Sequence, residues 1–471
     1  MYKNLSKKKP LNIITTRQLK LDGIDSPRDL FSRLADLPWA IWLDSCDSKH
    51  IDSRYSIMAW QPVKTLQTTG QQTHIYDLES EEVKISSDEP LHLLKMAQTS
   101  IFSGLQYEEN RLPFKGGSIG YFGYDLGRRF EQLPSIARQD IKLPDMAVGI
   151  YTSAIVFDNK SREFFLICPE SKRQFLENWL NEKARAKGKT PDFSLTSDWL
   201  SNMDKQAYGE KFKRVHDYLL SGDCYQINLA QRFTAQYQGD EFSAYLALRA
   251  ENHAPFSAFI RLENAAVLSV SPERFLQLQG DKVQSKPIKG TRPRGETPEQ
   301  DNAHATDLAN ADKDRAENLM IVDLLRNDIS KVCQPGSVVV PKLFDIESFP
   351  AVHHLVSTVE GRLSSGFDGT DLLRGAFPGG SITGAPKIRA MEIIEELEPH
   401  RRSVYCGAIG YLSACGNMDT SITIRTLVCE SGKIHCWAGG GLVADSVLDS
   451  EYQETFDKVE KILPVLKKLV I

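Results

Sequence analysis

Short runs of alternating apolar and polar residues recur through the second half of the chain, and they restrict its fold more than any other feature. The run YQINLAQRF at 225–233 places large apolar side chains at alternate positions, with Gln226 and Asn228 between them. Such period-two alternation predicts a strand with one face in a core. Strand-like runs follow within 257–279, and YCGAIGYLSA, SITIRTLV and KIHCWAG continue the pattern after residue 404.

A few helices interrupt these strands. Apolar residues recur at helical spacing between 208 and 219, and Gly222 supplies the stop. Helical patterns also occupy 312–329 and 387–398, and a last one extends over roughly 449–469. Because the strands come in runs and do not alternate strictly with helices, we predict an α+β fold with large antiparallel sheets.

The first 200 residues also contain strand-like runs, namely PWAIWL at 38–43, YSIMAW at 55–60 and MAVGIYTSAIVF at 146–157. The stretch 181–203 is rich in charge and contains Lys-Gly-Lys and Thr-Pro, which is typical of a linker. We therefore predict an N-terminal region over 1–200 and a second region over 204–463. The first ten residues are expected to form a loose arm.

The charge balance and the cysteines exclude several classes of function. Lys and Arg total 57 against 62 Asp and Glu, so the formal net charge is −5 and nothing global attracts nucleic acid or an anionic membrane. No run approaches the roughly 20 apolar residues of a membrane span. The eight cysteines form no CxxC pair, and we interpret them as reduced thiols of a cytoplasmic protein.

Two pairs of carboxylates are spaced for one face of a helix. Asp314 and Glu317 are three residues apart in the helix predicted at 312–329, and Glu451 and Glu454 are three apart in the last helix. Residues at i and i+3 share a face, so each pair projects its oxygens together. Two such helices facing each other can bind Mg²⁺, which takes a few carboxylates plus substrate oxygens. The alternative is that all four are solvated surface charges.

Glycine-rich segments at 379–384 and 439–441 match neither a phosphate-binding loop nor a dinucleotide fingerprint. We predict turns there, whose backbone N–H groups bind carboxylates. Arg425, predicted in mid-strand within SITIRT, needs an anion if buried, either a substrate carboxylate or an internal salt-bridge partner. His353 and His354 are adjacent, so in a strand at most one of them faces a site.

Seven motifs in order resemble those of one family, the chorismate-utilising enzymes, which include the synthases of anthranilate, aminodeoxychorismate, isochorismate and salicylate. The motifs are SPERF (271–275), PIKGTRPRG (287–295), DRAENLMIVDLLRND (314–328), PGGSITGAPK (378–387), GYLS with MDTSITIRT (410–426), AGGGLVADS (438–446) and EYQET (451–455). They cover most of 204–463, and LPWAIWLDS, FKGGSIGYFGYDLGRR and LPDMAVGIY resemble the family's N-terminal region. The resemblance implies a large α/β sandwich in which two packed antiparallel sheets have helices outside.

Two positions discriminate within the family. Lys289 in PIKGT is similar to the aminodeoxychorismate-forming members, whereas the others carry alanine there. Gln226 stands where water-using members place a lysine base, and an amide cannot act as a base. The resemblance therefore implies replacement of the C4 hydroxyl of chorismate by an amino group, a step toward p-aminobenzoate and folate. The alternatives are component I of anthranilate synthase and a non-catalytic tryptophan-binding scaffold.

The resemblance also assigns roles to individual residues. Glu273 would be the general acid for loss of the hydroxyl, Lys289 the nucleophile at C2, and His354 a neighbour of the leaving group. Mg²⁺ would be bound by Glu317 and Glu454, with Asp314 and Glu451 behind them through water. The expected substrate contacts are Thr291, Thr383, Tyr405, Arg425 and the backbone of Gly439, Gly440 and Gly441.

Two further partners are implied by the family. The chain has no cysteine elbow typical of a glutaminase, so ammonia would come from a separate glutamine amidotransferase subunit in a heterodimer. The segment WLDS at 42–45 corresponds to the place where amine-forming relatives bind tryptophan. Ser45, Pro255 and Phe256 are therefore expected to line a tryptophan pocket.

Overall fold

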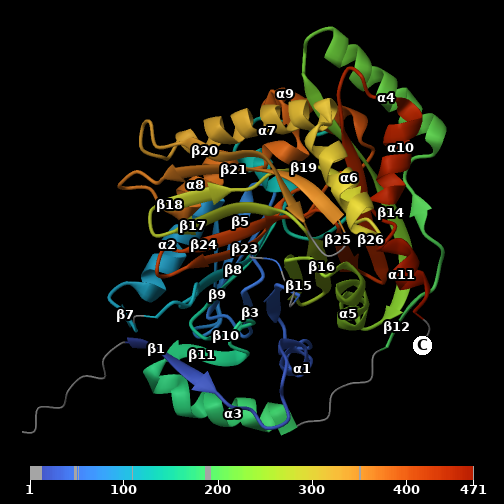
Figure 1. The fold of residues 1–471 in the computed structure, drawn as a ribbon. Helices are drawn as coiled ribbons and strands as arrows, with labels where there is room; N and C mark the ends of the chain where they lie inside the picture. Colours follow the sequence, from blue (N-terminus) through green and yellow to red (C-terminus); the bar gives the residue numbers. More distant parts are fainter. Residues whose placement is uncertain are drawn as a thin grey trace, which may run out of the picture.

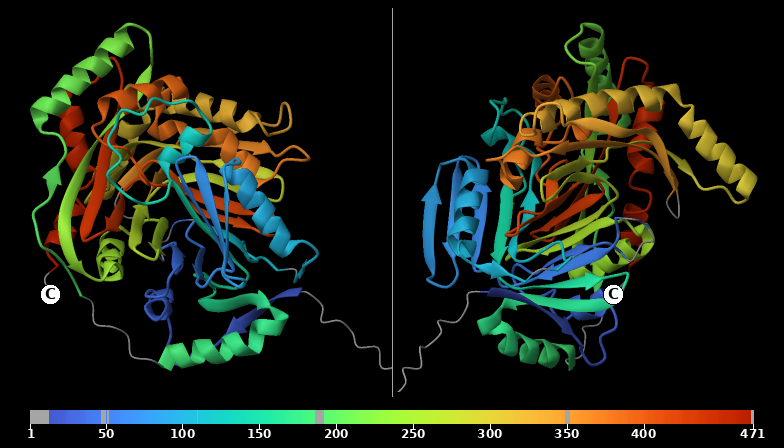
Figure 2. Two further views of the ribbon diagram at one scale, coloured as in Figure 1. Left: turned by 180° about the vertical axis from the view of Figure 1, so that it is seen from behind. Right: turned by 60° about the vertical axis from the view of Figure 1, so that its left-hand side comes forward.

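Two large sheets packed face to face form the body of the protein (Figure 1). The computed structural model describes residues 13–46, 50, 52–108, 110–185, 192–348 and 352–469, so the predicted N-terminal arm lies outside it. The predicted α+β architecture is confirmed, because both sheets are almost entirely antiparallel and the helices lie on their outer sides (Figure 2). Among the described residues, no helix is both long and apolar enough to span a bilayer.

In the described part of the chain, the larger sheet has 14 strands and the smaller one 12. In spatial order the larger sheet contains β12 (Phe193–Leu195), β14 (Gln226–Gly239), β26 (Lys433–Leu442), β25 (Thr426–Glu430), β16 (Ala265–Ser271), β15 (Phe256–Arg261), β2 (Ile41–Asp44), β3 (Tyr55–Ala59), β10 (Ala154–Asp158), β11 (Glu163–Pro169), β1 (Ile13–Leu19) and β7 (Gln106–Tyr107), while β13 (Leu200–Ser201) and β22 (Gly384–Ala385) also pair with β14. The smaller sheet contains β19 (Ile288–Pro293), β21 (Val352–Arg362), β18 (Lys282–Ser285), β17 (Arg274–Gln279), β24 (Met418–Ile422), β23 (Ala408–Ser413), β8 (Gly117–Phe122), β9 (Met146–Tyr151), β4 (Lys64–Thr69), β5 (Gln72–Asp77) and β6 (Glu82–Ser86), while β20 (Val339–Ser348) pairs with β21.

Alternation along the strands builds two cores. In β15, Ile260 belongs to a core between the sheets, and its neighbour Phe259 belongs to a second core on the outer face of the larger sheet. That outer face is covered by α1 (Pro27–Phe31), α3 (Arg173–Arg185), α5 (Glu241–Asn252) and α11 (Leu463–Lys467). The other helices among the described residues are α2 (Pro90–Phe102), α4 (Lys205–Leu220), α6 (Pro298–Ala309), α7 (Asp312–Ser330), α8 (Gly369–Ala376), α9 (Lys387–Leu397) and α10 (Leu448–Asp457), with the short 3-10 turns η1 (Tyr124–Arg129), η2 (Glu170–Lys172) and η3 (Gly380–Ile382).

Strands from both halves of the chain share each sheet. In the larger sheet β2 pairs with β15, and in the smaller sheet β8 pairs with β23. The stretch 181–203, predicted as a linker, begins inside α3 and contains β12 and β13, while residues 186–191 lie outside the described part. The two regions are therefore joined by continuous strand pairing.

The single closing helix predicted over 449–469 is wrong, because the structure has two shorter helices there. The helix α10 ends at Asp457, and α11 begins at Leu463 with Pro464 in its first turn. Proline has no N–H to donate to the preceding turn and its ring crowds that turn, so Pro464 strongly disfavours a continuous helix at this position. The helices predicted at 312–329 and 387–398 are confirmed to within one residue.

Candidate active site

The chain crosses from one sheet to the other at two adjacent points, and each crossing places a charged residue in a cavity. Pro272 and Glu273 connect β16 to β17, and residues 423–425 connect β24 to β25. The two connections are hydrogen-bonded to each other, since Ile422 N–H donates to Glu273 C=O at 3.1 Å and Val270 N–H donates to Arg425 C=O at 3.1 Å. Glu273 and Arg425 therefore reach the same space through a shared backbone frame.

That space is a cavity of about 520 Å³. It is bounded by the two crossings, by β19, β21 and β26, and by α7 and α10. Most residues predicted for the site line it, namely Glu273, Lys289, Thr291, Asp314, Glu317, His354, Tyr405, Arg425, Gly439, Gly441 and Glu454. Residues far apart in sequence thus converge as the family motifs imply.

Glu273 is buried, and its pKa is raised. Its side chain accepts a hydrogen bond from Ser381 Oγ at 3.1 Å, and the residue is 6% exposed. Burial raises the pKa of Glu273 to about 7, against the opposing effects of the Lys289 charge and the Ser381 hydrogen bond. A carboxyl with this pKa can donate a proton near neutral pH.

Lys289 reaches the cavity through a bulge in β19. The pairing of β19 with β21 shifts between Lys289 and Thr291, and Gly290 at the bulge has φ +70°. A Cβ on Gly290 would lie 2.8 Å from Asp314 Cγ, so glycine is needed for both conformation and space. Lys289 Nζ lies 3.4 Å from Ser381 C=O and 3.8 Å from Glu317 Oε2. Ser381 therefore contacts both Lys289 and Glu273.

The two adjacent histidines point apart, as predicted. His354 lines the cavity and its Nδ1 lies 2.9 Å from Thr291 Oγ1. His353 instead lies 2.9 Å from Asp301 and 2.8 Å from Ser348 Oγ. Burial, reinforced by the positive charge of Arg425, lowers the pKa of His354 to about 4, so its ring is neutral at physiological pH.

Arg425 was predicted in mid-strand, and this is wrong. It lies in the crossing just before β25, with φ +49°. The crossing aims its guanidinium into the cavity, whereas a strand position would place it in one of the sheets. Among the described residues Arg425 forms no salt bridge, so the alternative of an internal ion pair is not supported. Burial lowers its pKa, and the negative charge of Glu273 opposes that shift. An unpaired buried cation of this kind favours an anionic ligand.

The four predicted carboxylates gather on α7 and α10, at one end of the cavity. Glu317 is mostly buried, and this burial raises its pKa. The positive charges of Lys289 and Lys313 oppose the rise, whereas the negative charges of Glu454 and Glu451 add to it. Each carboxylate also has a cationic neighbour: Lys289 for Glu317, Lys458 for Glu454, Lys313 for Glu451 and Arg292 for Asp314. Glu451 lies just outside the cavity and accepts a hydrogen bond from Ser446 Oγ at 2.6 Å.

These carboxylates suit a hard cation, although the described residues contain no preformed cluster of three or more ligands. A Cβ on Gly440 would lie 3.2 Å from Glu451 Oε2 and 3.4 Å from Glu454 Oε1, so this glycine leaves room for both groups. Carboxylate oxygens that repel one another across a gap are the donors that Mg²⁺ prefers. The residues present therefore fit Mg²⁺ held by Glu317 and Glu454.

Residues 439–441 were predicted to form a turn, and this is wrong. They belong to the last part of strand β26. Gly439, Gly440 and Gly441 pair with Ala230, Leu229 and Asn228 of β14. Glycine lets the backbone of β14 approach β26 closely here, because a Cβ on Gly439 would lie 2.6 Å from the carbonyl oxygen of Leu229. The pairing of β26 with β25 stops at Cys436, and Gly439 and Gly441 line the cavity while Gly440 does not. Lys458 Nζ donates to Gly439 C=O at 2.7 Å.

Of the remaining predicted contacts, Tyr405 lines the cavity and stacks on Trp437 with ring centroids 5.9 Å apart. Thr383 does not line it, because its hydroxyl donates to Gly379 C=O at 3.1 Å and so joins the two ends of η3. The sequence prediction missed Ser381 and Lys458. Ser381 lies within the motif PGGSITGAPK, and Lys458 lies one helical turn after Glu454. These two positions were the signals that could have identified them.

A family model described as chorismate binding enzyme matches residues 39–464. The chain belongs to this family of chorismate binding enzymes. It is 55% identical over 447 residues to aminodeoxychorismate synthase component 1 of Escherichia coli (strain K12), covering 94% of this chain and 97% of that protein. It is 36% identical over 458 residues to anthranilate synthase component 1 of Thermus thermophilus, covering 96% of this chain and 97% of that protein.

A solved structure of the family has the same fold. The crystal structure of anthranilate synthase component I from Streptococcus pneumoniae TIGR4 matches with a TM-score of 0.78 at 33% identity, covering 88% of this chain and 93% of that chain. The fold expected from the family resemblance, a sandwich of two packed sheets with helices outside, is thus confirmed.

This chorismate binding enzyme has a second and larger cavity, of about 750 Å³. Ser45, Pro255 and Phe256, which were predicted for a tryptophan pocket, all line it. Ser45 Oγ lies 3.2 Å from Ser56 Oγ and accepts a hydrogen bond from Asn159 Nδ2 at 2.7 Å. The guanidinium of Arg274 lies 5.0 Å from the centre of the Phe256 ring.

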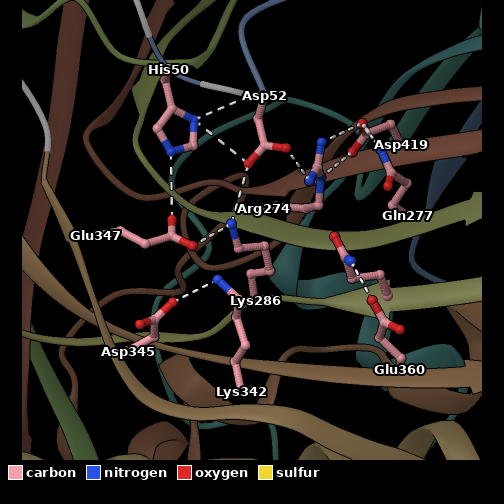
Figure 3. A network of polar contacts seen from close by, with 11 residues as sticks. His50, Asp52, Arg274, Gln277, Lys286, Lys342, Asp345, Glu347, Glu360 and Asp419 are labelled. Carbon is pink, nitrogen blue, oxygen red and sulfur yellow. Dashed lines mark hydrogen bonds and ion pairs between the residues drawn. The ribbon is translucent and has the colours of Figure 1, made fainter.

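An ion network of largely buried side chains reaches the second cavity, and three of its members, Asp52, Arg274 and Asp419, line that cavity (Figure 3). Arg274 donates to both oxygens of Asp419 at 3.0 Å and to Asp52 at 2.7 Å. Lys286 lies 3.6 Å from Asp52 and 2.7 Å from Glu347. Lys286 lies between β18 and β19, three residues before Lys289, and Glu347 of β20 pairs with His354 of the adjacent strand β21. The network is therefore connected to the elements that carry the site.

Proposed function

We propose that this chain is component I of an aminodeoxychorismate synthase, which converts chorismate and ammonia to 4-amino-4-deoxychorismate. The observation that carries the proposal is the grouping in one cavity of Lys289, of Glu273 with its raised pKa, and of Arg425, which has no salt-bridge partner among the described residues. Chorismate carries two carboxylates and a C4 hydroxyl, so it needs a cationic anchor and a proton donor. The relative from Escherichia coli that bears this name is 55% identical to the chain.

In the first step, Lys289 gives up a proton to solvent and its amine nitrogen attacks C2 of the ring. The C2–N bond forms, the two ring double bonds shift, and the C4–O bond breaks while Glu273 donates its proton to the leaving hydroxyl, which departs as water. In the second step ammonia attacks C4, the double bonds shift back, and the C2–N bond breaks to release Lys289. The new ammonium group returns one proton to Glu273, so the overall exchange is ammonia for water.

The other residues bind and orient the substrate. Arg425 offers two N–H donors to the enolpyruvyl carboxylate, beside Tyr405 and the cavity edge at Gly439 and Gly441. His354, whose pKa is lowered by burial and whose Nδ1 lies 2.9 Å from Thr291 Oγ1, would lie beside the leaving hydroxyl. Both roles need burial, because water in the cavity would compete for the same donors.

Mg²⁺ is the cofactor that these carboxylates would hold. Glu317 and Glu454 would bind it directly, with Asp314 and Glu451 behind them through water. When bound, the ion would neutralise the ring carboxylate of chorismate. Lys289 and Lys458, which lie beside Glu317 and Glu454, would then be released toward the cavity.

Ammonia would be supplied by a separate glutamine amidotransferase subunit, as the word component in the relatives' names implies a second chain. The second cavity would bind tryptophan, with Ser45, Pro255 and Phe256 in its wall. We place the protein in the cytoplasm, where its eight free thiols stay reduced.

The product assay tests the proposed function against the alternatives. The purified chain is incubated with chorismate, Mg²⁺ and ammonium, and the products are separated by chromatography. Formation of 4-amino-4-deoxychorismate supports the proposal. Anthranilate as the product would make the chain an anthranilate synthase component I, and the absence of turnover at every ammonium concentration would make it a non-catalytic scaffold.

A further inference from the structure

A buried arginine behind the active-site cavity makes more contacts than its own ion pair needs. Arg402 is 1% exposed, and it is not among the described residues that line the cavity. Its Nε donates to Glu398 Oε2 at 2.9 Å and its Nη2 donates to Oε1 at 2.6 Å. Such a two-point pair already satisfies the carboxylate charge. The guanidinium nevertheless makes further donations, and these reach residues of the cavity wall.

The further donations of Arg402 join two segments of that wall. Nη1 donates to Ile382 C=O at 2.9 Å, and Nη2 donates to Asn228 C=O at 2.8 Å and to Asn228 Oδ1 at 3.2 Å. Ile382 is the last residue of η3, Asn228 belongs to β14, and both line the cavity. The two segments also share a backbone hydrogen bond, from Asn228 N–H to Thr383 C=O at 2.8 Å. Arg402 thus fastens η3 to a strand of the larger sheet.

The turn η3 carries the residue that contacts both groups proposed to react. Ser381 Oγ donates to Glu273 at 3.1 Å, and Lys289 Nζ lies 3.4 Å from Ser381 C=O. A three-residue 3-10 turn has few hydrogen bonds of its own, and η3 has no side-chain cap at its N-terminus. Its position therefore depends on contacts with neighbouring segments, and the planar guanidinium of Arg402 supplies a rigid one.

We propose that Arg402 is a positioning residue for the reaction: it fixes η3 so that Ser381 holds Glu273 and Lys289 in their reacting geometry. This inference rests on the proposed function, because it takes Glu273 as the proton donor and Lys289 as the nucleophile. Arg402 acts at a distance, through the backbone of η3. Such an effect can be large, since a displacement of about 1 Å in a catalytic group costs on the order of a hundredfold in rate.

The surroundings of Arg402 favour arginine over lysine. The guanidinium carbon lies 5.0 Å from the centre of the Tyr124 ring and 5.7 Å from that of Tyr405, which itself lines the cavity. Aromatic rings favour a flat cation at these positions. A lysine would keep the charge beside Glu398, but its single nitrogen cannot reach the carboxylate, β14 and η3 in one plane. Arg402→Lys therefore separates the charge of the residue from its fork of donors.

Steady-state kinetics with chorismate, Mg²⁺ and saturating ammonium test the inference. We expect kcat of Arg402→Lys to fall about 10- to 100-fold. Its KM for chorismate should stay within about threefold of the parent, because the arginine and the carboxylates that would hold the substrate make no described contact with Arg402. Ser381→Ala removes the hydroxyl that contacts Glu273, and its kcat should fall about two- to tenfold, as for the loss of one hydrogen bond.

The double variant shows whether Arg402 acts through Ser381. If it does, Arg402→Lys should lower kcat less in the Ser381→Ala background than in the parent, so the two effects do not multiply. Effects that multiply would overturn the inference. A kcat of Ser381→Ala equal to that of the parent would also overturn it, even if Arg402→Lys does not fold.

The pH dependence is a readout that a mere loss of stability does not move. Burial raises the pKa of Glu273 to about 7, and the hydrogen bond from Ser381 opposes that rise. When the hydrogen bond is weakened, the carboxyl keeps its proton to higher pH. The alkaline decline of kcat/KM should therefore shift to higher pH in both Arg402→Lys and Ser381→Ala. A decline at the parent's pH in both variants would contradict the role of η3.

Arg128 offers a matched control. It is mostly buried, it pairs with Asp125 at 3.0 Å and with Glu395 of α9, and it is not among the described residues that line the cavity. Arg128→Lys should lower Tm as Arg402→Lys does, yet keep kcat within about twofold of the parent. An equal loss of kcat in both variants would assign the effect to general destabilisation. A parent that forms no 4-amino-4-deoxychorismate would refute the proposed function, whereas normal turnover by Arg402→Lys would refute only this inference.

Discussion

Glu273 and Arg274 are neighbours in the chain, yet their side chains line two different cavities. Glu273 faces the cavity of about 520 Å³ and Arg274 the one of about 750 Å³. Their position where β17 begins explains this, because successive residues of an extended strand point to opposite sides. The wall between the proposed chorismate and tryptophan pockets is therefore one strand thick at this point.

Breaking the ion network in this wall should destabilise the protein. Asp419→Ala leaves the buried Arg274 with one carboxylate in place of two, and we expect a loss of about 3 kcal/mol in the free energy of unfolding. Urea denaturation measures it. Asp281→Ala, which removes the partner of the exposed Arg362, should cost less than about 1 kcal/mol. An equal loss in the free energy of unfolding in the two variants would show that burial of the network adds nothing to stability.

Replacing the buried acid should abolish turnover and change the pH dependence of stability. Glu273→Gln cannot donate a proton, so kcat should fall by about 10²- to 10⁴-fold. The folded-state pKa of about 7 lies above the ordinary 4.5, so the stability that the protonated Glu273 contributes is complete below pH 4.5 and is lost as the pH rises through about 7. The Tm advantage of Glu273→Gln should therefore grow between pH 5 and pH 8.

The same carboxyl should limit the parent enzyme at alkaline pH. If Glu273 must be protonated in the free enzyme, kcat/KM for chorismate should decline above about pH 7, with one apparent pKa. A flat profile up to pH 9, or a Tm difference between parent and Glu273→Gln that does not vary with pH, would contradict the assigned protonation state.

Removing the nucleophile should stop amine transfer and covalent capture together. Lys289→Ala should lower the rate of 4-amino-4-deoxychorismate formation by at least about a thousandfold. Intact mass spectrometry of the parent, mixed with chorismate and no ammonium, should find an adduct that Lys289→Ala lacks. Lys286→Ala is the control, because Lys286 lies in the ion network outside the cavity and should keep the adduct. Full activity of Lys289→Ala would exclude a covalent role.

The carboxylates on α7 and α10 should determine metal affinity. Glu317→Gln and Glu454→Gln are expected to weaken Mg²⁺ binding by more than about 100-fold, and Asp314→Asn by about 10- to 100-fold, as for residues that act through water. Isothermal titration of Mg²⁺ in the presence of chorismate measures the affinity directly. Asp312→Asn removes an exposed carboxylate from the same helix and should have no effect. Unchanged binding in Glu317→Gln would refute the ligand assignment.

Tryptophan should stabilise the protein through the second cavity. A ligand that binds only the folded state raises Tm, so excess tryptophan should raise it by several degrees in a thermal scan. Phe256→Ala removes one wall of the cavity and the ring beneath Arg274, and this variant should lose most of the shift. A similar shift with excess alanine, or a full shift in Phe256→Ala, would argue against a specific tryptophan site.

The features of the site that could be predicted from the sequence are those that depend on residue spacing within one helix or strand. The spacing of Asp314 and Glu317 predicts one helix face, and the adjacency of His353 and His354 predicts opposite faces of one strand. Both hold in the structure, because side-chain direction in a regular element depends only on local backbone geometry. The motifs and their order were sufficient to predict the family and its fold.

The parts that failed depend on contacts between distant segments. Gly439, Gly440 and Gly441 form the end of β26 because β14 and the α10 carboxylates approach them closely, and a glycine run alone does not distinguish this from a turn. Arg425 lies at a crossing because β24 and β25 belong to different sheets. Which sheet a strand joins is decided by long-range pairing, which leaves no local pattern.

The sequence by itself thus determined which residue types are available: the proton donor, the amine, the carboxylate pairs and the arginine, each within a short motif. Only the tertiary structure decided that Glu273 and Arg425 meet, since their crossings are far apart in the chain and are joined by backbone hydrogen bonds. It also decided that Gln226 Oε1 is buried without a partner among the described residues. Such features follow from the packing of one sheet on the other, and packing is a property of the whole chain.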